Sequence, residues 1–583
     1  MAAVSAPLSF GVSILRRRLG VLCDQLKLNA GGRKSVAAAT AWVYIIGKHT
    51  KMTELALSPV ATTGPAPTLV SPGHTRALLL GLGLATGMEF YTFDSVNLVL
   101  PDMTGTLGVS EDEASWLLTV YSSSLFFGVP ISIWLAGHLG YKRFLIGSTI
   151  LFAAASMGCA ASSTLDVLLV WRAIQGLAGA GLIMWWRASV YLLMPKPQRS
   201  PSLMRISTIL YLSSAGGLLV SGYLTDRFNW RLIFLPNLLY AVSAVCLLLR
   251  YYPTVPRASS PRLVRTDWPG ILLIAAALIS LQIVLNRGEI DDWFGSSLIR
   301  TLTWIFGAAL TALLLWQRSR RNPAPLLDLA LVLDRNVLSS ILIGLFAGMI
   351  LSGSLFVLPE FLRNITEHTY SATQTGQIIC VYALTAAAVR PLMVPFIARL
   401  GQRKAIAFAL TMLIASMLVF QRFLTAGTPK EYYILPLMLY GLCLSPLLPA
   451  IGSGTVARVA QEKLLDGVSI YMTFRQFGAS LGVAVLNVLL VHRETLHSSR
   501  LFEHLHGSDG GTLTSLALRS ANMVAHGYSS ADASRVALAQ LAEAAKQQAA
   551  TLSNADAFGF MAAIGVVALC CIPIIPPTPV MRK

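Results

Sequence analysis

The chain has 583 residues, of which 55% are hydrophobic and only 12% are charged. Soluble domains carry about 25% charged residues, so this composition excludes a string of ordinary soluble domains. The formal net charge of +18 would suit nucleic acid, but the basic residues are dispersed between apolar runs, which argues against nucleic acid as a partner. The apolar runs reach about 20 residues, the length of a helix that crosses a bilayer. We therefore expect an all-α polytopic membrane protein.

The apolar runs predict about fourteen transmembrane helices, because a chain in hydrocarbon must satisfy its backbone polar groups internally. The predicted spans are 76–100, 114–136, 144–163, 165–194, 206–224, 232–250, 268–285, 298–316, 337–362, 372–398, 405–423, 432–456, 468–491 and 557–575. Residues 492–556 form a polar segment between the last two spans. We expect it to be an external loop with an alanine- and glutamine-rich helical stretch near 534–550.

Basic residues in the short loops predict the orientation of the helices. Every second loop carries two or three Lys or Arg residues: Lys142 and Arg143; Lys196, Arg199 and Arg205; Arg257, Arg262 and Arg265; Arg318, Arg320 and Arg321; Arg399, Arg403 and Lys404. The loop Pro101–Glu113 contains four acidic residues and no basic one. Because Lys- and Arg-rich loops stay in the cytoplasm, we expect both termini to be cytoplasmic and the protein to lie in the inner (plasma) membrane.

Residues 1–75 precede the first predicted span and are basic and poor in acidic residues. This segment lacks the short apolar core and small-residue cleavage site of a signal peptide. We expect a cytoplasmic tail, with two interpretations left open. In the first, translation starts at Met52 and residues 1–51 are a gene-model artefact. In the second, the basic tail lies on the anionic cytoplasmic leaflet.

The first predicted helix contains Glu89 and Asp94, with Asn97 one turn after Asp94. An Asp at the centre of a spanning helix costs about 2.5–3.5 kcal/mol, so such residues usually face a cavity and mark ion or substrate pathways. A carboxyl whose charged form is disfavoured by burial can bind and release a proton as its access to water changes. We predict proton coupling by Asp94 and, second, by Glu89. The alternative is that Asp94 stays solvated near the helix end and fixes packing. The two acids lie roughly 140° apart around the helix, so they need not face one surface.

The fourth predicted helix places Arg172, Gln175, Gly176 and Gly179 on one face, at spacings i, i+3, i+4 and i+7. The glycines allow another helix to approach closely, and Arg172 presents a cation toward it. We predict that Arg172 lies close to an acidic group and that its positive charge changes the proton affinity of that group. The alternative is that it binds backbone carbonyls and joins two helices. Arg187, near the inner end, is expected to extend its charged head toward the membrane boundary.

A second set of residues is assigned to the substrate pathway or to helix packing. Its members are polar residues and glycines within predicted spans: Asn97, Gln175, Gly176, Gly179, Gly217, Gly222, Arg390, Arg475 and Gln476.

From about residue 76 onward the chain resembles the fourteen-helix drug:proton antiporter branch of the major facilitator superfamily, the EmrB/QacA type. The segments that carry the resemblance are Met88-Glu89, Asn97–Pro101, Arg172–Gly176, Trp230–Phe234 with Asn237, Arg475 with Gly478 and Gly482, and the long segment before the last helix. It implies the major facilitator fold, with six-helix bundles in 76–250 and 337–583 and two inserted helices in the linker 251–336. It also implies alternating access around a midplane site and exchange of protons for amphipathic organic molecules, with no cofactor. In a Gram-negative cell it implies a periplasmic adaptor and an outer-membrane channel.

Three positions depart from the family pattern. The family's first-helix Asp is replaced by Thr92, and the nearest carboxylate is Asp94. The Asp expected between the second and third helices is Gly137. The fifth-helix motif expects Gly-Pro and then Gly-Gly, whereas this chain has Gly217-Leu218 and Ser221-Gly222, which removes the proline kink. A facilitator-type transporter of another small molecule, without strict proton antiport, therefore stays open as an alternative.

Other functional classes find weaker support in the sequence. No Gly-x-x-x-x-Gly-Lys-Ser/Thr phosphate loop is present, which argues against an ATP-driven pump. The candidate residues for a membrane-embedded enzyme are His497, His504 and His506 with Glu494 and Glu503, but the histidine spacing lacks the i,i+4 geometry of a helical zinc site. The seven cysteines show no metal-site or disulfide spacing. We expect no enzyme activity and no bound metal, and the substrate cannot be read from the sequence.

Overall fold

The computed structural model describes residues 72–254, 267–319, 322, 329–332, 334–366, 370–456, 464–504 and 510–575. All regular secondary structure within these ranges is helical, which confirms the all-α class. Residues 1–71, and with them the question of Met52, lie outside the described residues.

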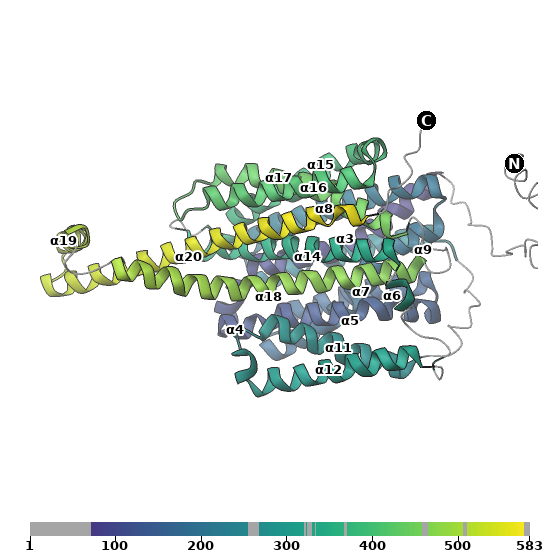
Figure 1. Cartoon of the computed structure of the whole chain (residues 1–583), viewed down its shortest axis with the longest axis horizontal. Helices are drawn as coiled ribbons and strands as arrows, with labels where there is room; N and C mark the ends of the chain where they lie inside the picture. The colour runs from purple at the N-terminus through teal and green to yellow at the C-terminus, as the bar shows by residue number, and fades with distance from the viewer. Residues whose placement is uncertain are drawn as a thin grey trace, which may run out of the picture. The chain divides into compact units, whose positions relative to one another are not determined.

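Six long helices form the N-terminal bundle, and Figure 1 shows their arrangement. They are α3 (Pro72–Leu107), α5 (Trp116–Leu139), α6 (Tyr141–Ala161), α7 (Leu165–Leu193), α8 (Lys196–Arg227) and α9 (Pro236–Tyr251), with the short α4 (Glu111–Ala114) and η1 (Trp230–Phe234) in the connections. Helix α3 packs against α7, α8 and α9, and α7 packs against α5 and α6. Helix α3, which carries Glu89 and Asp94, therefore packs mainly within its own bundle.

Six further helices form the C-terminal bundle. They are α14 (Arg335–Glu360), α15 (Ala372–Leu400), α16 (Gln402–Phe423), α17 (Ile434–Val456), α18 (Leu464–His504) and α20 (Ser530–Cys570). The two bundles meet along two helix pairs, α8 with α15 and α5 with α18. The expected major facilitator architecture of two six-helix bundles is confirmed.

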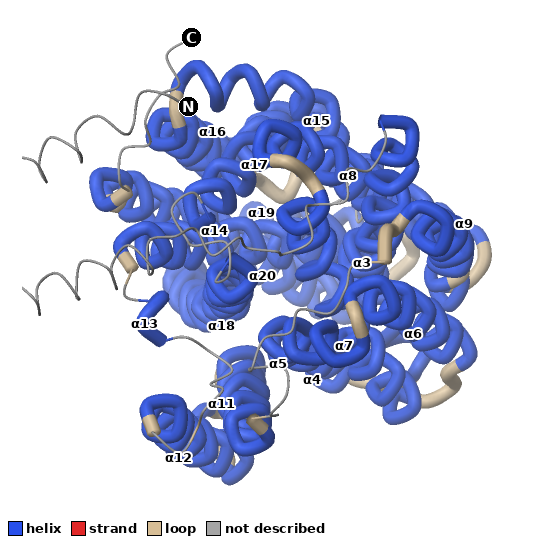
Figure 2. The backbone as a smooth tube through the Cα atoms, turned by 90° about the vertical axis from the view of Figure 1, so that its right-hand side faces the viewer, coloured by secondary structure: helices blue, strands red, loops and turns tan. Residues whose placement is uncertain are grey.

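The inserted helices pack as a hairpin at the edge of the bundles, as Figure 2 shows. They are α11 (Trp268–Arg287) and α12 (Ser297–Arg318). Helix α11 packs against α5 of one bundle and α18 of the other, whereas α12 packs mainly on α11. The Asp267 carboxylate fixes the pair, because it caps α11 at Gly270 N and accepts a hydrogen bond from Trp316 Nε1 of α12 at 2.7 Å. Helix α11 thus covers one of the two seams between the bundles.

Thirteen helices in the described part of the chain are long and apolar enough to cross a membrane. Helix α3 is outside this group because Glu89, Asp94 and Asp102 make it more polar. Its 36 residues nevertheless pack along the length of α8 and α9, so we take it as the fourteenth membrane-length helix. The chain is a multi-pass membrane protein.

The same short connection occurs once in each bundle. Gly140, between α5 and α6, and Gly401, between α15 and α16, adopt φ values of +88° and +78°, in the left-handed region that glycine tolerates best. The basic residue two positions later then binds the end of the last helix of its bundle. Lys142 Nζ donates to Leu249 O at 2.7 Å, and Arg403 donates to the Pro573 and Ile575 carbonyls beyond α20. The two bundles are built on one repeated plan.

The last two spans are longer than expected. Helix α18 continues to His504, and α20 already begins at Ser530, with α19 (Gly510–Ala525) between them. Figure 1 shows these helices extending beyond the other helices. Much of the expected loop 492–556 is therefore helical, because its alanines, leucines and glutamines favour helix. The helical stretch predicted near 534–550 is part of α20.

Glycines let the helices approach one another closely. A Cβ atom added to Gly176 of α7 would lie under 3.0 Å from Tyr121 O of α5, and one added to Gly482 of α18 would lie under 3.0 Å from Met349 O of α14. Backbone atoms cannot move aside as a flexible side chain can, so these two positions require glycine. The close contact of α7 with α5 at Gly176 agrees with a helix-packing role for this residue.

We expect Gly176→Leu to destabilise the protein by about 1–3 kcal/mol, the usual cost of overpacking, because the new side chain would meet the backbone of α5. Thermal unfolding of the purified protein would measure the loss. Gly147→Leu on α6 is the matched control, since an added Cβ there meets no atom within 4 Å. Equal melting temperatures for the two variants would contradict the prediction.

Candidate functional site

A cavity lies between the two bundles and contains both acids of α3. This central cavity is lined from the N-terminal bundle by Glu89, Asp94, Tyr121, Trp186, Arg187 and Tyr211, and from the C-terminal bundle by Tyr382, Arg390, Tyr440, Arg475 and Gln476, among others. Glu89 and Asp94 therefore line one cavity despite their separation around the helix, because Phe90 and Phe93, which lie between them on α3, line it too. The structure brings together four residues singled out from the sequence in addition to Asp94: Glu89, Arg390, Arg475 and Gln476.

Asp94 lies where the two bundles meet. Its side chain is 8% exposed. Its Oδ2 accepts hydrogen bonds from Ser214 Oγ of α8 and from Tyr382 Oη of α15, the latter at 3.1 Å. The two hydroxyls also contact each other at 2.9 Å. One carboxylate therefore joins α3 and α8 of the first bundle to α15 of the second. The alternative of a solvated Asp94 near the helix end does not fit this burial.

Glu89 is bound inside the N-terminal bundle. Tyr121 Oη of α5 donates to Glu89 Oε1 at 3.3 Å, and Gly179 of α7 packs beside the glutamate side chain. Glu89 and Asp94 thus differ in their partners: Glu89 is held within one bundle, and Asp94 connects two.

Arg172 reaches Glu89 through an aromatic ring and makes no ion pair with it. The side chain is 1% exposed, and its guanidinium lies 4.1 Å from the centroid of the Tyr121 ring, a cation–π arrangement. Its Nη1 donates to Gln175 Oε1 at 2.7 Å, and its Nε donates to Leu117 O of α5 at 3.4 Å. The contact with Leu117 O supports the interpretation in which Arg172 joins two helices, and Tyr121 provides the route by which it can influence Glu89.

A network of hydrogen bonds surrounds Thr92, the position at which the resemblance implies an aspartate. Asn237 of α9 donates from Nδ2 to Thr92 Oγ1 at 2.8 Å and to Ser156 Oγ at 3.1 Å. Gln175 Nε2 of α7 donates to the same Ser156 Oγ at 2.8 Å. Thr92 therefore accepts a hydrogen bond within the bundle, and the nearest carboxylate on α3 is Asp94, which contacts α8 and α15.

Three arginines contribute positive charge to the cavity. Arg187 lines it and contacts Met472 Sδ at 3.1 Å, so the expectation that it extends to the membrane boundary is wrong. The cause is that α7 and α18 converge there and direct the side chain inward. Arg390 is buried, donates to Leu444 O at 3.1 Å and lies 5.1 Å from the Tyr211 ring centroid. Arg475 completes the group. The cavity can therefore accept both cationic and anionic parts of a solute.

The remaining predicted residues contact neighbouring helices or lie outside the central cavity. Gly217 approaches Tyr91 O of α3 and Gly222 approaches Ala372 O of α15, with an added Cβ at 2.6 and 2.5 Å. Asn97 donates back to Phe93 O at 2.8 Å and does not reach Asp94.

Two further cavities continue from the central one toward one end of the bundle. The first, which we call the neutral chamber, shares Tyr121 and Gln476 with the central cavity. The second, which we call the acidic vestibule, lies beyond the chamber and shares Asn97 and Asn487 with it. The vestibule is lined by Glu111, Asp112, Glu289, Glu360 and Arg363, among others.

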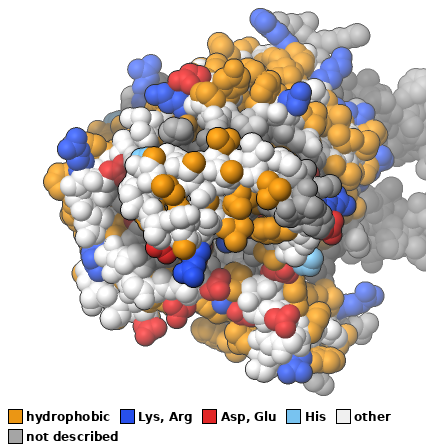
Figure 3. Space-filling view, turned by 90° about the vertical axis from the view of Figure 1, so that its left-hand side faces the viewer, with side chains coloured by type: hydrophobic (Ala, Val, Ile, Leu, Met, Phe, Trp, Pro, Cys, Tyr) orange, Lys and Arg blue, Asp and Glu red, His pale blue; other side chains and the backbone are white. Residues whose placement is uncertain are grey.

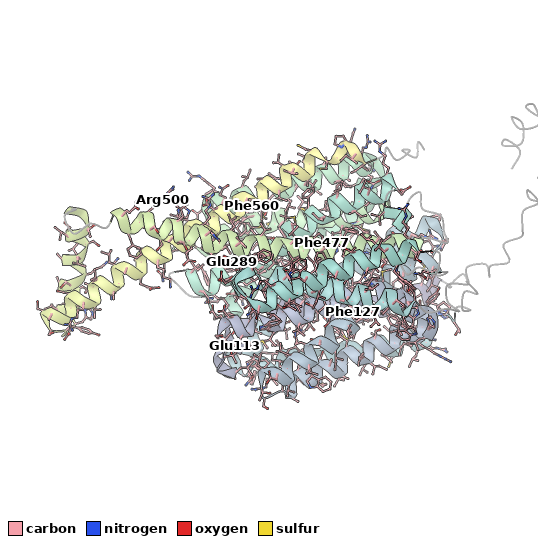
Figure 4. All side chains as sticks on the ribbon, turned by 60° about the horizontal axis from the view of Figure 1, so that its bottom comes forward. Glu113, Phe127, Glu289, Phe477, Arg500 and Phe560 are labelled. Atoms are coloured by element: carbon pink, nitrogen blue, oxygen red, sulfur yellow. The ribbon has the colours of Figure 1, made fainter. Side chains whose placement is uncertain are left out.

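Figure 4 places Phe127 and Phe477 along the middle of the bundles and Glu113 and Glu289 near this end. Figure 3, which views the molecule from the same end, shows acidic side chains gathered in the lower part of the face. The three cavities therefore form a series that begins at Glu89 and Asp94, continues through the uncharged chamber and ends at the acidic vestibule.

Sequence reasoning missed the hydroxyl groups that bind the two acids. Tyr121, Ser214 and Tyr382 lie 32, 120 and 288 residues from the acids they contact, and no local pattern marks them. The available signal was weak: a tyrosine within an apolar span can supply a buried hydroxyl that needs a partner.

The candidate enzyme residues whose side chains the structure describes, His497, Glu494 and Glu503, do not form such a site. His497 Nε2 contacts Asp556 Oδ2 at 3.0 Å and connects α18 with α20, and His506 lies outside the described residues. Within the described ranges no group of three or more His, Cys, Asp or Glu residues could hold a metal ion.

The family assignment follows from sequence comparison. The profile of the Major Facilitator Superfamily matches residues 82–483, and the chain belongs to this superfamily. It is thus a membrane transporter and not a membrane-embedded enzyme, and the resemblance drawn from its motifs is confirmed.

Among curated relatives, the multidrug export protein EmrB of Escherichia coli (strain K12) is 26% identical over 426 residues, which cover 73% of this chain and 82% of the relative. The probable multidrug resistance protein EmrY of the same strain is 27% identical over 444 residues, with coverage of 76% and 85%.

Solved structures confirm the fold. The peptide transporter POT in complex with sulfate superimposes with a TM-score of 0.56 and 15% sequence identity, covering 85% of this chain and 94% of that chain. The human organic anion transporter MFSD10 (TETRAN) gives a TM-score of 0.52 at 15% identity, with coverage of 84% and 99%. At this identity the likeness concerns the fold alone.

We expect Arg172→Ala to lower both stability and transport. The change leaves Gln175 Oε1 and Leu117 O without their donor, a loss of about 1–3 kcal/mol, and removes the cation beside Tyr121. Thermal unfolding and transport in proteoliposomes would measure the two effects. Arg300→Ala on α12, where the arginine is exposed, is the control; wild-type values for Arg172→Ala would refute the prediction.

Proposed function

We propose that the protein is a proton-coupled secondary transporter that exports amphipathic organic compounds by alternating access. The observation that carries the proposal is the position of Asp94, whose carboxylate is bonded to both bundles at once. The curated relatives EmrB and EmrY, named as multidrug export and resistance proteins, support export as the direction.

Protonation of Asp94 provides a physical link between the proton and the movement of the bundles. An ionised carboxylate accepts charge-assisted hydrogen bonds, which are stronger than neutral ones, so the charged form favours the contact of α3 with Ser214 and Tyr382. Protonation removes that charge and weakens the connection between the bundles. The bundles are then free to rock about their interface, and Asp94 is exposed to the opposite side, where it releases the proton.

The membrane provides the energy for this cycle. Moving one elementary charge across the membrane potential is worth about 2.3 kcal/mol per 100 mV, and a pH gradient adds to it. Glu89, held by Tyr121 in the same cavity, is the second proton-binding candidate. The aromatic side chains Trp186 and Tyr211 offer apolar surface to a substrate, whereas the acids and arginines offer polar partners.

The loop charges and the relatives support a proposal for the location and the partners. We place the protein in the inner (plasma) membrane with both termini in the cytoplasm and the acidic vestibule outside. The tip formed by α18, α19 and α20 then projects from the outer side of the membrane. If the cell is Gram-negative, this tip is the surface for a periplasmic adaptor that leads to an outer-membrane channel.

Asp94→Asn is expected to abolish proton-coupled flux while the protein remains folded, because the amide has nearly the same shape, can still bond to the hydroxyls and carries no titratable proton. Flux would be measured in proteoliposomes with an imposed pH gradient, and folding by thermal unfolding. Asp166→Asn serves as control, since Asp166 is exposed at the start of α7. Retained coupling in Asp94→Asn would reject Asp94 as the coupling residue and favour Glu89, or the facilitator-type transporter without strict antiport.

The orientation predicts opposite labelling of two serines when each is replaced by cysteine in a cysteine-free variant. Ser530→Cys, at the start of α20, should react with a membrane-impermeant maleimide in intact cells. Ser200→Cys, at the start of α8, should react only after permeabilisation. Both serines are exposed in the structure, so accessibility within the protein does not differ. The reverse result would invert the proposed topology.

A further inference from the structure

The neutral chamber has a wall that the inserted helix α11 supplies. Gln282, Asn286 and Ile290 of α11 and the turn after it line the chamber together with residues of α3, α5, α14 and α18. An inserted helix that only filled space against lipid would keep apolar residues on both faces. Here the face toward the bundles carries two amides, whereas Leu272 on the other side is 66% exposed.

Gln282 fastens α11 to both bundles. Its side chain is 1% exposed. Its Nε2 donates to Ser122 Oγ of α5 at 3.0 Å, and its Oε1 accepts from Ser480 Oγ of α18 at 2.6 Å. Both polar atoms of the amide are therefore occupied, and Gln282 holds the wall in place across the seam.

Asn286, one turn later, uses only one of its two polar side-chain atoms in a hydrogen bond. Its Nδ2 donates to the same Ser122 Oγ at 3.3 Å, which leaves Oδ1 as the free atom of the amide. Within the described part of the chain this buried oxygen accepts no hydrogen bond. A buried acceptor without a donor costs about 1–3 kcal/mol, so the position favours a ligand that brings an N–H or O–H group.

The charges around the chamber restrict the kind of ligand. Among the described residues that line the chamber, none is charged: the polar ones are amides and hydroxyls, and the apolar ones include Phe93, Leu355 and Phe356. The central cavity on one side contains Glu89, Asp94 and three arginines, and the vestibule on the other side is acidic. A charged group would lose its hydration in the chamber without gaining an opposite charge.

We propose that this chamber is a second ligand subsite, separate from the carboxylate cavity, that takes uncharged amphipathic molecules with a hydrogen-bond donor, and that Asn286 Oδ1 accepts the donor. The inference deepens the proposed export function and rests on it for its place on the exit route. The apolar body of the ligand packs against the aromatic and leucine side chains of the chamber. Gln282 keeps α11 in position and does not itself bind the ligand.

The test compares two ligands of nearly equal shape, 4-propylphenol, which has an O–H donor, and 4-propylanisole, which has none. Binding to the purified full-length protein is measured from the ligand-dependent rise in melting temperature, in the absence of any proton gradient. Wild-type protein is expected to bind the phenol about three- to tenfold more tightly than the anisole, the effect of one net hydrogen bond. Asn286→Leu is expected to reduce this ratio to about one.

Leu272→Ala, on the exposed side of α11, is the matched control and should keep the wild-type ratio. If leucine is not tolerated at position 286, Asn286→Ala removes the same acceptor. No phenol preference in the wild type, no binding of either ligand, or an unchanged preference in Asn286→Leu would each overturn the inference. Asp94→Asn separates the two proposals: it should lose coupled flux and keep the phenol preference, so either proposal can fail without the other.

Discussion

The structure depends on one buried carboxylate that must keep hydroxyl partners from both halves of the protein. Asp94 lies on α3, which packs mainly within its own bundle, and the donors come from α8 and from α15. A carboxylate in the interior of a membrane protein is tolerated only when paired or hydrogen-bonded. The apposition of α8 and α15 therefore includes an ionisable contact at Asp94. Gly222 permits the close backbone approach of α8 to α15, and Gly217 permits that of α8 to α3.

The second seam, between α5 and α18, is arranged differently. There a third helix, α11, covers the contact, and an amide of α11 bonds to one serine from each bundle. One seam thus contains hydrogen bonds to an ionisable carboxylate, and the other contains hydrogen bonds between neutral groups. This division suits a molecule whose halves move relative to each other while a solute passes between them.

Hydropathy predicted the helices well, because a helix that spans the bilayer must have a minimum length and must satisfy its backbone hydrogen bonds internally. The ends of α11 and α15 and the start of α7 agree with the sequence to within about two residues, the usual limit of such assignments. The extension of α18 and α20 was underestimated, because the signal of a spanning helix stops where the apolar residues stop, although the helix itself continues on propensity.

The site was predictable in part. Glu89, Asp94, Arg390, Arg475 and Gln476 were found because polar residues in apolar spans are rare. The pairing of Asp94 with Tyr382, and the inward direction of Arg187, depend on which helices become neighbours, and a single sequence does not give that information. The amides of α11 were overlooked for a related reason: neutral polar residues cost less in a membrane than charged ones, so they draw less attention.

The uninterrupted course of α18 has a mechanical consequence. The segment from about Val491 to His504 is continuous with the part of the helix that carries Arg475, Gln476 and Ser480, and at 1.5 Å per residue it adds roughly 20 Å. A rigid rod of this length acts as a lever arm, so that a tilt of about 10° near the solute path displaces its end by roughly 3–4 Å. Any protein docked on the tip would sense the state of the transport cycle through that displacement, and a probe attached there would report it from the aqueous side.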